Sequence, residues 1–236
     1  MAKRLDSILA QCAGISRTQA QKAVRNGEIM LNGTAVTDPK TQADYGSEIL
    51  YRGEKINTSE TVLIMLNKPA GVISASRDMN EKTVIDLIPQ RLYRKGLFPA
   101  GRLDRDTTGL MLITDNGQLA HSILSPRKHL PKQYEAVLDT SCSAELRKEF
   151  ETGMVLDSGE KCLPAHLEIS KLDPHKVTVV ICEGMYHQIK RMFGKFHIGV
   201  VSLKRVRIGG LWLDETLAEG ECRPLEDSEK EILFTP

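Results

Sequence analysis

The chain has 236 residues, and its 32 Lys and Arg residues nearly balance 31 Asp and Glu residues, for a formal net charge of +1. Bulk positive charge is therefore excluded as a basis for binding nucleic acid, and any such role must rest on local patches. The length favours one or two domains with substantial apolar cores.

The sequence carries no motif for a metal, a nucleotide cofactor or a membrane span. Its five cysteines are widely spaced without a Cys-x-x-Cys pair, which argues against a zinc site and a disulfide framework. Neither a Gly-x-Gly-x-x-Gly nor a Walker-type loop occurs. We expect neither a leader peptide nor a membrane span, because no apolar run approaches roughly 18 residues. We therefore expect a cytoplasmic protein that needs no metal or cofactor.

The first sixty residues predict a small module of two short helices and a few strands. Apolar residues at helical spacing predict a helix over residues 5–12, and a capping box at Ser16 and Gln19 predicts the start of a second helix. A hairpin over residues 28–36 and a strand over residues 48–51 follow. The module is a compact unit whose helices carry three cations, Arg17, Lys22 and Arg25.

A polar run over residues 52–60 separates this module from the rest and has the composition of a linker. We therefore expect two domains, over residues 1–58 and residues 59–236.

The middle of the chain predicts strands joined by turns and short helices. Residues 62–66 form an apolar strand candidate. The strand is followed by a predicted turn, Asn67-Lys68-Pro69-Ala70-Gly71. We interpret Lys68 first as a turn residue and second as a possible RNA contact. Short helices are expected over residues 83–88 and 119–124.

The stretch from Gly101 to Leu110 is the most informative part of the chain. It places one acid, Asp104, between Arg102 and Arg105, at the entry to a short apolar run that predicts a buried strand. A neighbouring guanidinium favours the ionised form of a carboxylate, which can then act as a nucleophile or base. An ion-pair network that fixes a tight turn is the alternative. We expect Asp106 to be structural and paired with Arg105.

The second half of the chain predicts two strands and an amphipathic helix. Residues 132–138 alternate in polarity and place Tyr134 on the face of a half-buried strand, where a core tyrosine is the simplest interpretation. Residues 177–181 predict another strand. A helix follows whose core face carries Ile189, Met192, Phe193 and Phe196, while its other faces carry His187, Lys190, Arg191 and Lys195.

A basic patch runs from Gly184 to Leu213 and contains no acid. Its cations are Lys190, Arg191, Lys195, Lys204, Arg205 and Arg207. A solvated basic face would explain them, and phosphate binding becomes the better explanation only together with other motifs.

Three separate motifs closely resemble the signatures of pseudouridine synthases. They are Gly-Arg-Leu-Asp with Thr-x-Gly-Leu at 101–110, Lys-x-Tyr at 132–134, and the string Glu-Gly-Met-Tyr-His-Gln-Ile-Lys-Arg-Met at 183–192. Together with Arg-Ile-Gly-Gly at 207–210, they are most similar to the RsuA/RluB group that modifies ribosomal RNA, and within it to the branch acting on 16S RNA. Residues 3–52 resemble the S4 RNA-binding domain.

The resemblance implies an α+β fold, with a small S4-like domain preceding a pseudouridine-synthase domain. That second domain would be built on a mixed, mainly antiparallel sheet with flanking helices. Alternation and turns alone support only a strand-rich domain with short helices.

The resemblance also implies a reaction, the isomerisation of a flipped-out uridine to pseudouridine. Asp104 would be the catalytic carboxylate, and either attack on C1′ or removal of a sugar proton fits the sequence. Tyr134 would stack on the target base and help to move its proton, and Lys190 would pair with Asp104.

Further residues would contact RNA. Arg102 would hold the phosphate of the flipped nucleotide or fill its vacated place in the stack. Relatives often carry Arg where Met185 stands, so that contact is either missing or supplied by Arg205 or Arg207. The remaining candidates are Arg17, Lys22, Arg25, His187 and Arg191. The expected partner is ribosomal RNA or an assembling small subunit, and we expect a monomer.

Three alternatives remain open from the sequence. The chain could be a non-catalytic RNA binder associated with the ribosome, or a synthase acting on 23S RNA. It could also be a glycoside hydrolase that uses Asp104 and Asp106, because such enzymes need two carboxylates at a set separation.

Overall fold

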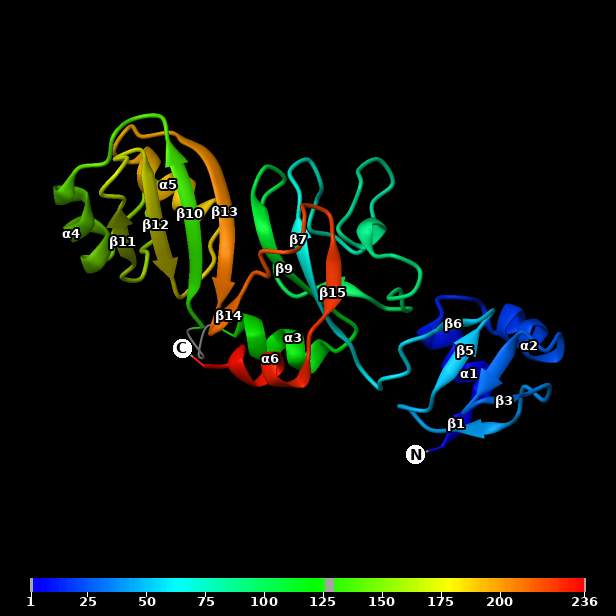
Figure 1. Cartoon of the computed structure of the whole chain (residues 1–236). Coiled ribbons are helices and arrows are strands. Elements are labelled where there is room, and N and C mark those ends of the chain that lie inside the picture. Colours follow the sequence, from blue (N-terminus) through cyan, green and yellow to red (C-terminus); the bar gives the residue numbers. More distant parts are fainter. Residues whose placement is uncertain (1, 126–129, 236) are drawn as a thin grey trace.

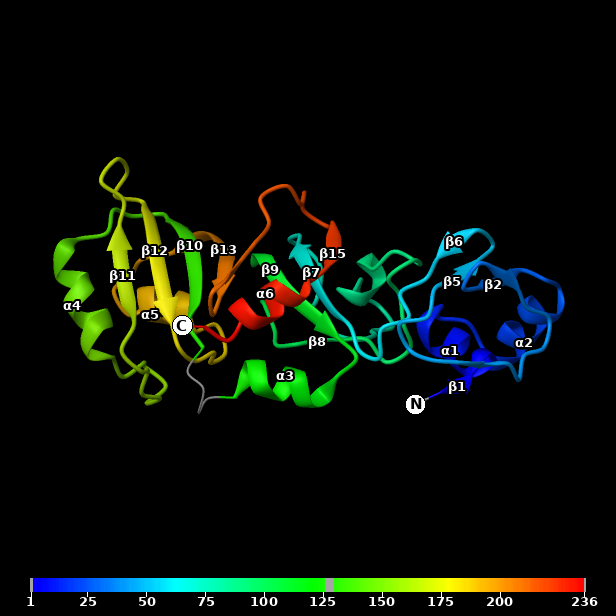
Figure 2. The ribbon, with the colours of Figure 1, turned by 60° about the horizontal axis from the view of Figure 1, so that its bottom comes forward.

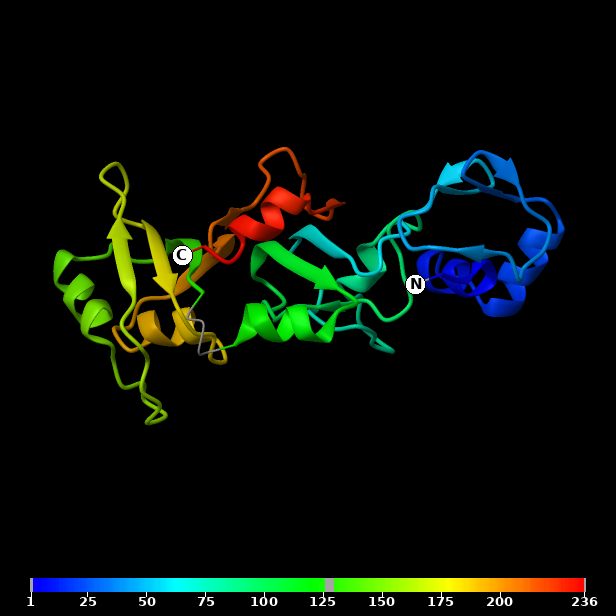
Figure 3. The same cartoon turned by 90° about the horizontal axis from the view of Figure 1, so that it is seen from below.

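The computed structural model describes residues 2–125 and 130–235, and Figure 1 shows three regions in a row. The N-terminal module occupies one end of the elongated molecule, as the turned views in Figures 2 and 3 also show. A central region contains β7, β9 and β15, and the far region contains β10 to β13. Within the described residues no helix combines the length and apolarity that a membrane crossing requires.

The N-terminal module folds around an apolar core of its own, which includes Leu5, Ile8, Val24, Ile29 and Ile49. Its helices are α1 (Leu5–Cys12) and α2 (Arg17–Arg25), and its sheet has the order β3-β2-β5-β6. These strands are Thr34–Ala35, Ile29–Leu31, Ile49–Tyr51 and Glu54–Lys55, while β1 (Lys3–Arg4) pairs with β4 (Gln42–Ala43).

The predicted capping box of α2 is confirmed. The backbone N–H of Gln19 donates to the Ser16 hydroxyl at 3.2 Å, and the N–H of Ser16 donates to the Gln19 side chain at 2.8 Å. The predicted linker is partly wrong, because Glu54 and Lys55 form β6 at the edge of the module sheet.

Asp6 is a buried acid at the start of α1, held by three side chains of the module. Arg4 Nη2 lies 2.7 Å from Asp6 Oδ2, Gln21 donates at 2.8 Å, and Arg17 lies at 3.4 Å. Burial alone would raise the pKa of Asp6, but these hydrogen bonds outweigh it and lower the pKa from 3.8 to about 2.

We expect Asp6→Asn to remove about 2 kcal/mol of the free energy of unfolding at neutral pH, because the lowered pKa of Asp6 stabilises the fold once the carboxyl is ionised. This contribution is fully present above about pH 4 and disappears as the pH falls toward 2. Denaturant titrations at pH 7 and pH 2.5 check it. Equal stability losses at both values would contradict the role of the Asp6 charge.

The module contacts the rest of the chain through a few hydrogen bonds to backbone carbonyls. Gln90 donates to the carbonyl of Ala13 at 2.7 Å, and the N–H of Lys95 donates to the carbonyl of Gln11 at 3.1 Å. Arg94 is buried beside them and donates to the carbonyl of Ser59 at 2.6 Å. These contacts fix the chain where it enters the second region.

The main sheet has the strand order β11-β12-β10-β13-β9-β7-β15. Its strands are His166–Ile169, Lys176–Ile181, Lys132–Leu138, Val200–Ile208, Thr108–Thr114, Leu63–Lys68 and Cys222–Pro224. Two short strands lie off this path, with β14 (Leu211–Trp212) paired to β13 and β8 (Phe98–Pro99) paired to β9. The predicted mixed, mainly antiparallel sheet is confirmed, since among the strands of the described residues only β13 and β9 pair in parallel.

The parallel junction between β9 and β13 divides the sheet into two halves (Figure 1). Its register aligns Lys204 with Thr108 and Arg205 with Gly109. One half consists of β11, β12, β10 and β13, and the other consists of β9, β7 and β15. The sheet is therefore continuous through a narrow contact at its centre.

Apolar side chains cover both faces of the central strands. Leu63 and Met65 pack into one core, whereas their neighbours Ile64 and Leu66 pack into another on the opposite face. This alternation follows from the period of two in a strand.

Helices α3 (Gly117–Leu124), α4 (Ala144–Thr152), α5 (Gln188–Gly194) and α6 (Asp227–Ile232) flank the sheet. The helix predicted over residues 83–88 is only one turn of 3₁₀ helix, Ile85–Leu87, ahead of Pro89.

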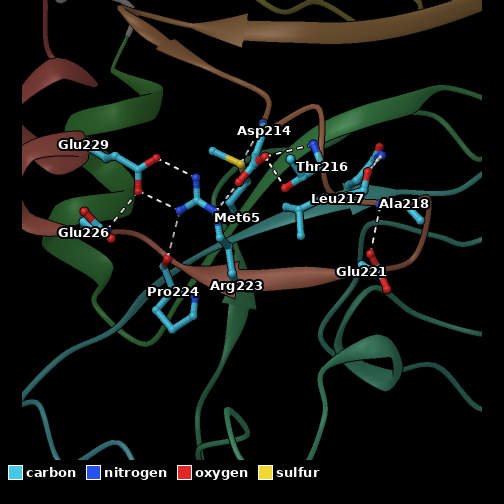
Figure 4. A network of polar contacts seen from close by, with 11 residues as sticks. Met65, Asp214, Thr216, Leu217, Ala218, Glu221, Arg223, Pro224, Glu226 and Glu229 are labelled. Carbon is cyan, nitrogen blue, oxygen red and sulfur yellow. Dashed lines mark hydrogen bonds and ion pairs between the residues drawn. The ribbon is translucent and has the colours of Figure 1, made fainter.

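An ion-pair cluster fixes the C-terminal segment to the sheet (Figure 4). The guanidinium of Arg223 on β15 lies 2.6 Å from Asp214 and 2.7 Å from Glu229 on α6. The bonds that Arg223 donates to Glu229 and Asp214 raise the pKa of Arg223, and its bonds to Glu229 lower the pKa of that acid. The cluster therefore ties α6 to the edge strand.

Candidate active site

A cavity of about 500 Å³ lies where the two halves of the sheet meet. Its lining comes from the loop before β9, from β10 and β13, and from the segment that leads into α5. The volume falls within the usual range for small-ligand sites. Six predicted site residues line it together: Arg102, Asp104, Tyr134, His187, Lys190 and Arg205.

Asp104 lies in a loop that is held almost entirely through backbone atoms. The Ser74 hydroxyl donates to the carbonyl of Leu103 at 2.7 Å and accepts from its N–H at 3.0 Å. The N–H of Thr107 donates to the carbonyl of Asp104 at 3.2 Å, which closes the turn. The Asp104 side chain therefore remains available to the cavity while its backbone is fixed.

Lys68, at the end of β7, is buried beneath the loop that carries Asp104 and holds it in place by hydrogen bonds. Its ammonium group donates to the carbonyls of Thr107 at 2.9 Å, Pro69 at 3.0 Å and Arg105 at 3.2 Å, and the side chain is fully buried. Burial lowers the pKa of Lys68 to about 8, against the opposing attraction of the nearby acids. Lys68 is thus a structural residue at the end of β7, directly before the predicted turn, and its burial contradicts the second interpretation as an RNA contact.

We expect Lys68→Met to lower kcat of the reaction in this cavity by about 100-fold, because a misplacement near 1 Å has an effect of that size. The carbonyls of Arg105 and Thr107 lose their donor, so the loop that carries Asp104 loosens. Single-turnover kinetics measures this change. Lys82→Met is the matched control, since Lys82 is an exposed lysine whose neighbour Glu81 pairs with Arg105 of the same loop. A kcat within threefold of the wild type would show that Lys68 does not hold the loop.

The partners of Asp104 come from the other half of the sheet. His187 Nε2 lies 3.4 Å from Asp104 Oδ1, and Lys190 Nζ lies 3.5 Å from Asp104 Oδ2. The side chain of Asp104 is 27% exposed. The alternative interpretation, an ion-pair network of Asp104 with its flanking arginines, is wrong for Arg105, which pairs with Glu81 at 3.0 Å.

Lys190 is shared between two acids. Its ammonium group donates to both carboxylate oxygens of Asp106, at 2.6 and 2.7 Å, and stands farther from Asp104. These bonds lower the pKa of Asp106, whose side chain is 71% exposed. The expected pairing of Asp106 with Arg105 is therefore also wrong. Asp106 instead holds the Lys190 ammonium group beside Asp104.

Helix α5 positions Lys190 by burying its opposite face. Ile189, Met192 and Phe193 pack into the core, as their spacing predicts. Gln188, which sequence reasoning missed, is buried and joins the N–H of Met185 at 3.0 Å to Glu183 at 2.7 Å. It fixes the turn that precedes the helix.

Tyr134 and Arg205 form the wall of the cavity from neighbouring strands. They are direct partners in the register of β10 and β13, and the guanidinium carbon of Arg205 lies 6.0 Å from the Tyr134 ring centroid. Arg205 is buried and donates to the carbonyl of Leu110 at 2.8 Å, while its Nη2 has no hydrogen-bond partner among the described residues. This wall places an aromatic ring and a positive charge opposite the Asp104 loop.

A model of a known family matches this part of the chain. The family described as RNA pseudouridylate synthase matches residues 62–195. This range includes every cavity residue described above except Arg205. The chain belongs to this family. A model of the S4 domain also matches, over residues 3–49.

Full-length relatives agree with this assignment. The synthase is 41% identical to an uncharacterised RNA pseudouridine synthase of Bacillus subtilis, over 99% of both chains. It is also 41% identical to ribosomal small subunit pseudouridine synthase A of Haemophilus influenzae, over 98% of this chain and 99% of that one. A crystal structure of a pseudouridylate synthase shares 40% identity and a TM-score of 0.68, over 98% and 99% of the two chains.

Several predicted RNA contacts of the synthase lie outside the cavity lining. The guanidinium of Arg191 is bonded to Glu160, Ser158 and the carbonyl of Tyr186, so it braces the loop before α5. Arg207 lies over the Trp212 ring, 5.4 Å from its centroid.

The three cations of the S4 module that we expect to contact RNA lie on α2. Arg17 remains 56% exposed while it pairs with Asp6, and Lys22 and Arg25 are exposed. Within residues 2–125 and 130–235, no group of three or more His, Cys, Asp or Glu side chains is arranged to hold a metal ion.

Proposed function

We propose that this synthase converts a uridine of ribosomal RNA, in the 16S RNA of the small subunit, to pseudouridine. The observation that carries the proposal is the convergence of Asp104, Tyr134 and Lys190 on one cavity, although they come from three separate elements. The similarity over nearly the full chain to a relative named for the small subunit supports the choice of RNA.

Asp104 is the catalytic carboxylate in this proposal. Its ionised form attacks C1′ or removes a sugar proton, and in both cases uracil departs with the electron pair of the C1′–N1 bond. Uracil then turns and C5 bonds to C1′. In the first route this bond displaces the Asp104 carboxylate from C1′, and in the second the sugar regains the proton that Asp104 removed. N1 gains a proton and the proton on C5 is lost. The reaction is an isomerisation, so its atoms and electrons balance without a further reactant.

The remaining cavity residues bind and orient the flipped nucleotide. Tyr134 offers a ring on which the uracil stacks, and stacking on an aromatic ring is worth about 1–3 kcal/mol per base. Lys190 and His187 lie within 3.5 Å of the Asp104 carboxylate and hold it in place. Arg102 is exposed at the cavity. It binds the phosphate of the flipped nucleotide or fills the space that the flipped base leaves in the stack. Arg205 lies in the wall behind the base.

In the proposed function one domain catalyses the reaction and the other binds RNA. Residues 59–236 form the catalytic domain, and residues 1–58 form an RNA-binding domain that presents Arg17, Lys22 and Arg25 to phosphates. Arg191 and Arg207 add positive charge outside the cavity. The protein acts as a cytoplasmic monomer on 16S RNA, free or in an assembling subunit.

The alternatives predict different sites from the one observed. A glycoside hydrolase needs a second carboxylate that is free to act. Asp106 is engaged through both oxygens by Lys190, which disfavours that role. A protein that only binds RNA has no use for a carboxylate held beside an ammonium group in a cavity.

Mapping pseudouridines in ribosomal RNA from cells with and without this protein tests the proposal. We expect a single position in 16S RNA to lose its pseudouridine and to regain it when the wild-type gene is restored. Loss of a position in 23S RNA would move the substrate to the large subunit. An unchanged map would reject the proposed function. Incubating the purified protein with free 16S RNA and with subunit precursors then identifies the form that reacts.

A further inference from the structure

An exposed aromatic ring stands at the rim of the cavity, next to the residues that contact Asp104. Tyr186 lines the cavity, yet its side chain is 72% exposed, unlike most large apolar or aromatic side chains of this chain. Its ring stacks on that of His187, with 3.8 Å between centroids and 18° between planes. Because His187 covers only one face of Tyr186, the other face is open.

The backbone is shaped to hold this pair of rings. His187 has a φ of +48°, in the left-handed region that non-glycine residues rarely adopt. Such strain persists only where the surroundings enforce it, and it clusters at binding and catalytic sites. The carbonyl of Tyr186 accepts a hydrogen bond of 3.1 Å from Arg191, and the N–H of Gln188 donates to Met185 at 3.3 Å. The backbone that carries the two rings is therefore held on both sides.

The ring pair extends from the catalytic carboxylate toward solvent. His187 Nε2 stands 3.4 Å from Asp104, and Tyr186 follows it outward. A nucleotide chain that places its target base against Tyr134 must leave the cavity across this rim. The charges there suit its phosphates, since the exposed Arg102 and the Lys190 ammonium group line the same cavity.

We infer that the open face of Tyr186 is a stacking site for the unpaired base immediately next to the target uridine in the RNA. Aromatic side chains stack on any base, because every base offers a π face. The neighbouring base becomes unstacked when the uridine is flipped, and Tyr186 replaces the lost stacking partner. This inference rests on the proposed function, since it takes the occupant of the cavity to be a uridine in RNA.

A cycle that combines a protein change with an RNA change tests this contact directly. The RNA is a fragment around the mapped uridine, with an abasic site at the preceding or the following position. The protein is the full chain as wild type, Tyr186→Ala or Tyr186→Phe. Fluorescence anisotropy gives Kd, and tritium release from C5-labelled uridine gives kcat and KM.

We expect Tyr186→Ala to weaken binding of the intact RNA by about tenfold or more, through Kd and KM rather than kcat. An abasic site at one of the two flanking positions should weaken the wild type to the same extent. Combining both changes should weaken binding no further than either alone. Tyr186→Phe should bind like the wild type, because the ring and not the hydroxyl makes the contact.

Leu172→Ala is the control for loss of exposed apolar surface, since Leu172 is 97% exposed and does not line the cavity. Independent, multiplying effects of Tyr186→Ala and both abasic sites would overturn the inference, as would an unchanged Kd for Tyr186→Ala. Failure of the proposed function looks different, because the wild type would then release no tritium from any ribosomal fragment. Anisotropy with the same RNA fragments does not depend on turnover, so it measures the contact of Tyr186 with the RNA even when no tritium is released.

Discussion

Asp104→Asn is expected to abolish pseudouridine formation, with a fall in kcat of at least about 10⁴-fold. A neutral amide can neither attack C1′ nor accept a proton from the sugar, so both forms of the reaction lose their reactive group. Tritium release from RNA labelled at C5 of uridine measures the loss. RNA affinity should survive, since the substitution keeps the shape of the side chain.

The structure explains why this variant should still fold. Lys190 makes its two short bonds with Asp106 rather than with Asp104, so the ammonium group keeps a partner after the change. Asp106→Asn is the matched control on the same loop. It removes the tether of Lys190 but leaves the reactive carboxylate, so we expect at most about a tenfold loss. Turnover by Asp104→Asn above one part in a hundred of the wild type would remove Asp104 from the chemistry.

Gly109→Ala is expected to destabilise the catalytic domain by about 4 kcal/mol or more, through steric overlap at the junction of the two half-sheets. Gly109 has a φ of +97°, and a Cβ there would lie 2.2 Å from the carbonyl oxygen and 2.9 Å from the nitrogen of Arg205. Both atoms belong to the backbone of β13, so neither can move aside without opening the strand pairing. Urea denaturation followed by fluorescence measures the loss.

Gly96→Ala separates the steric overlap from the strain of the backbone. Gly96 has a φ of +88°, but no atom lies within 4 Å of the position of a Cβ. We expect it to cost only about 1 kcal/mol. Any folded Gly109→Ala protein should also lose turnover beyond its lost folded fraction, because the junction sets the distance from Asp104 to Lys190. Equal stabilities of the two variants would contradict this role of Gly109.

Local patterns in the sequence predict much of the fold, because they depend on neighbours in the chain. The capping box at Ser16 and Gln19 forms as predicted, since both partners lie within one helical turn. The apolar face of α5 is also confirmed, because helical periodicity alone specifies it. The one-turn helix before Pro89 shows the limit, where a proline ends the helix before a second turn can form.

The electrostatics of the site could not be predicted in this way. Adjacent arginines suggest partners for Asp104 and Asp106, but the partners observed lie more than 80 positions away, at the start of α5. Lys68 is a second example, since its bonds reach carbonyls 37 and 39 residues along the chain. A lysine in a turn motif gives no sign of burial, and only the folded sheet brings three carbonyls to it. The convergence of Asp104, Tyr134 and Lys190 was predicted from the family resemblance and not from their spacing.

The separate core of the N-terminal module has a consequence for how RNA reaches the cavity. The N-terminal module and the catalytic domain are two binding units joined by a few contacts. Once either unit has bound the RNA, binding by the other becomes effectively intramolecular. The high local concentration that results allows the cavity itself to bind its uridine weakly. Product can then leave quickly, while the choice among competing uridines is spread over a much larger stretch of RNA.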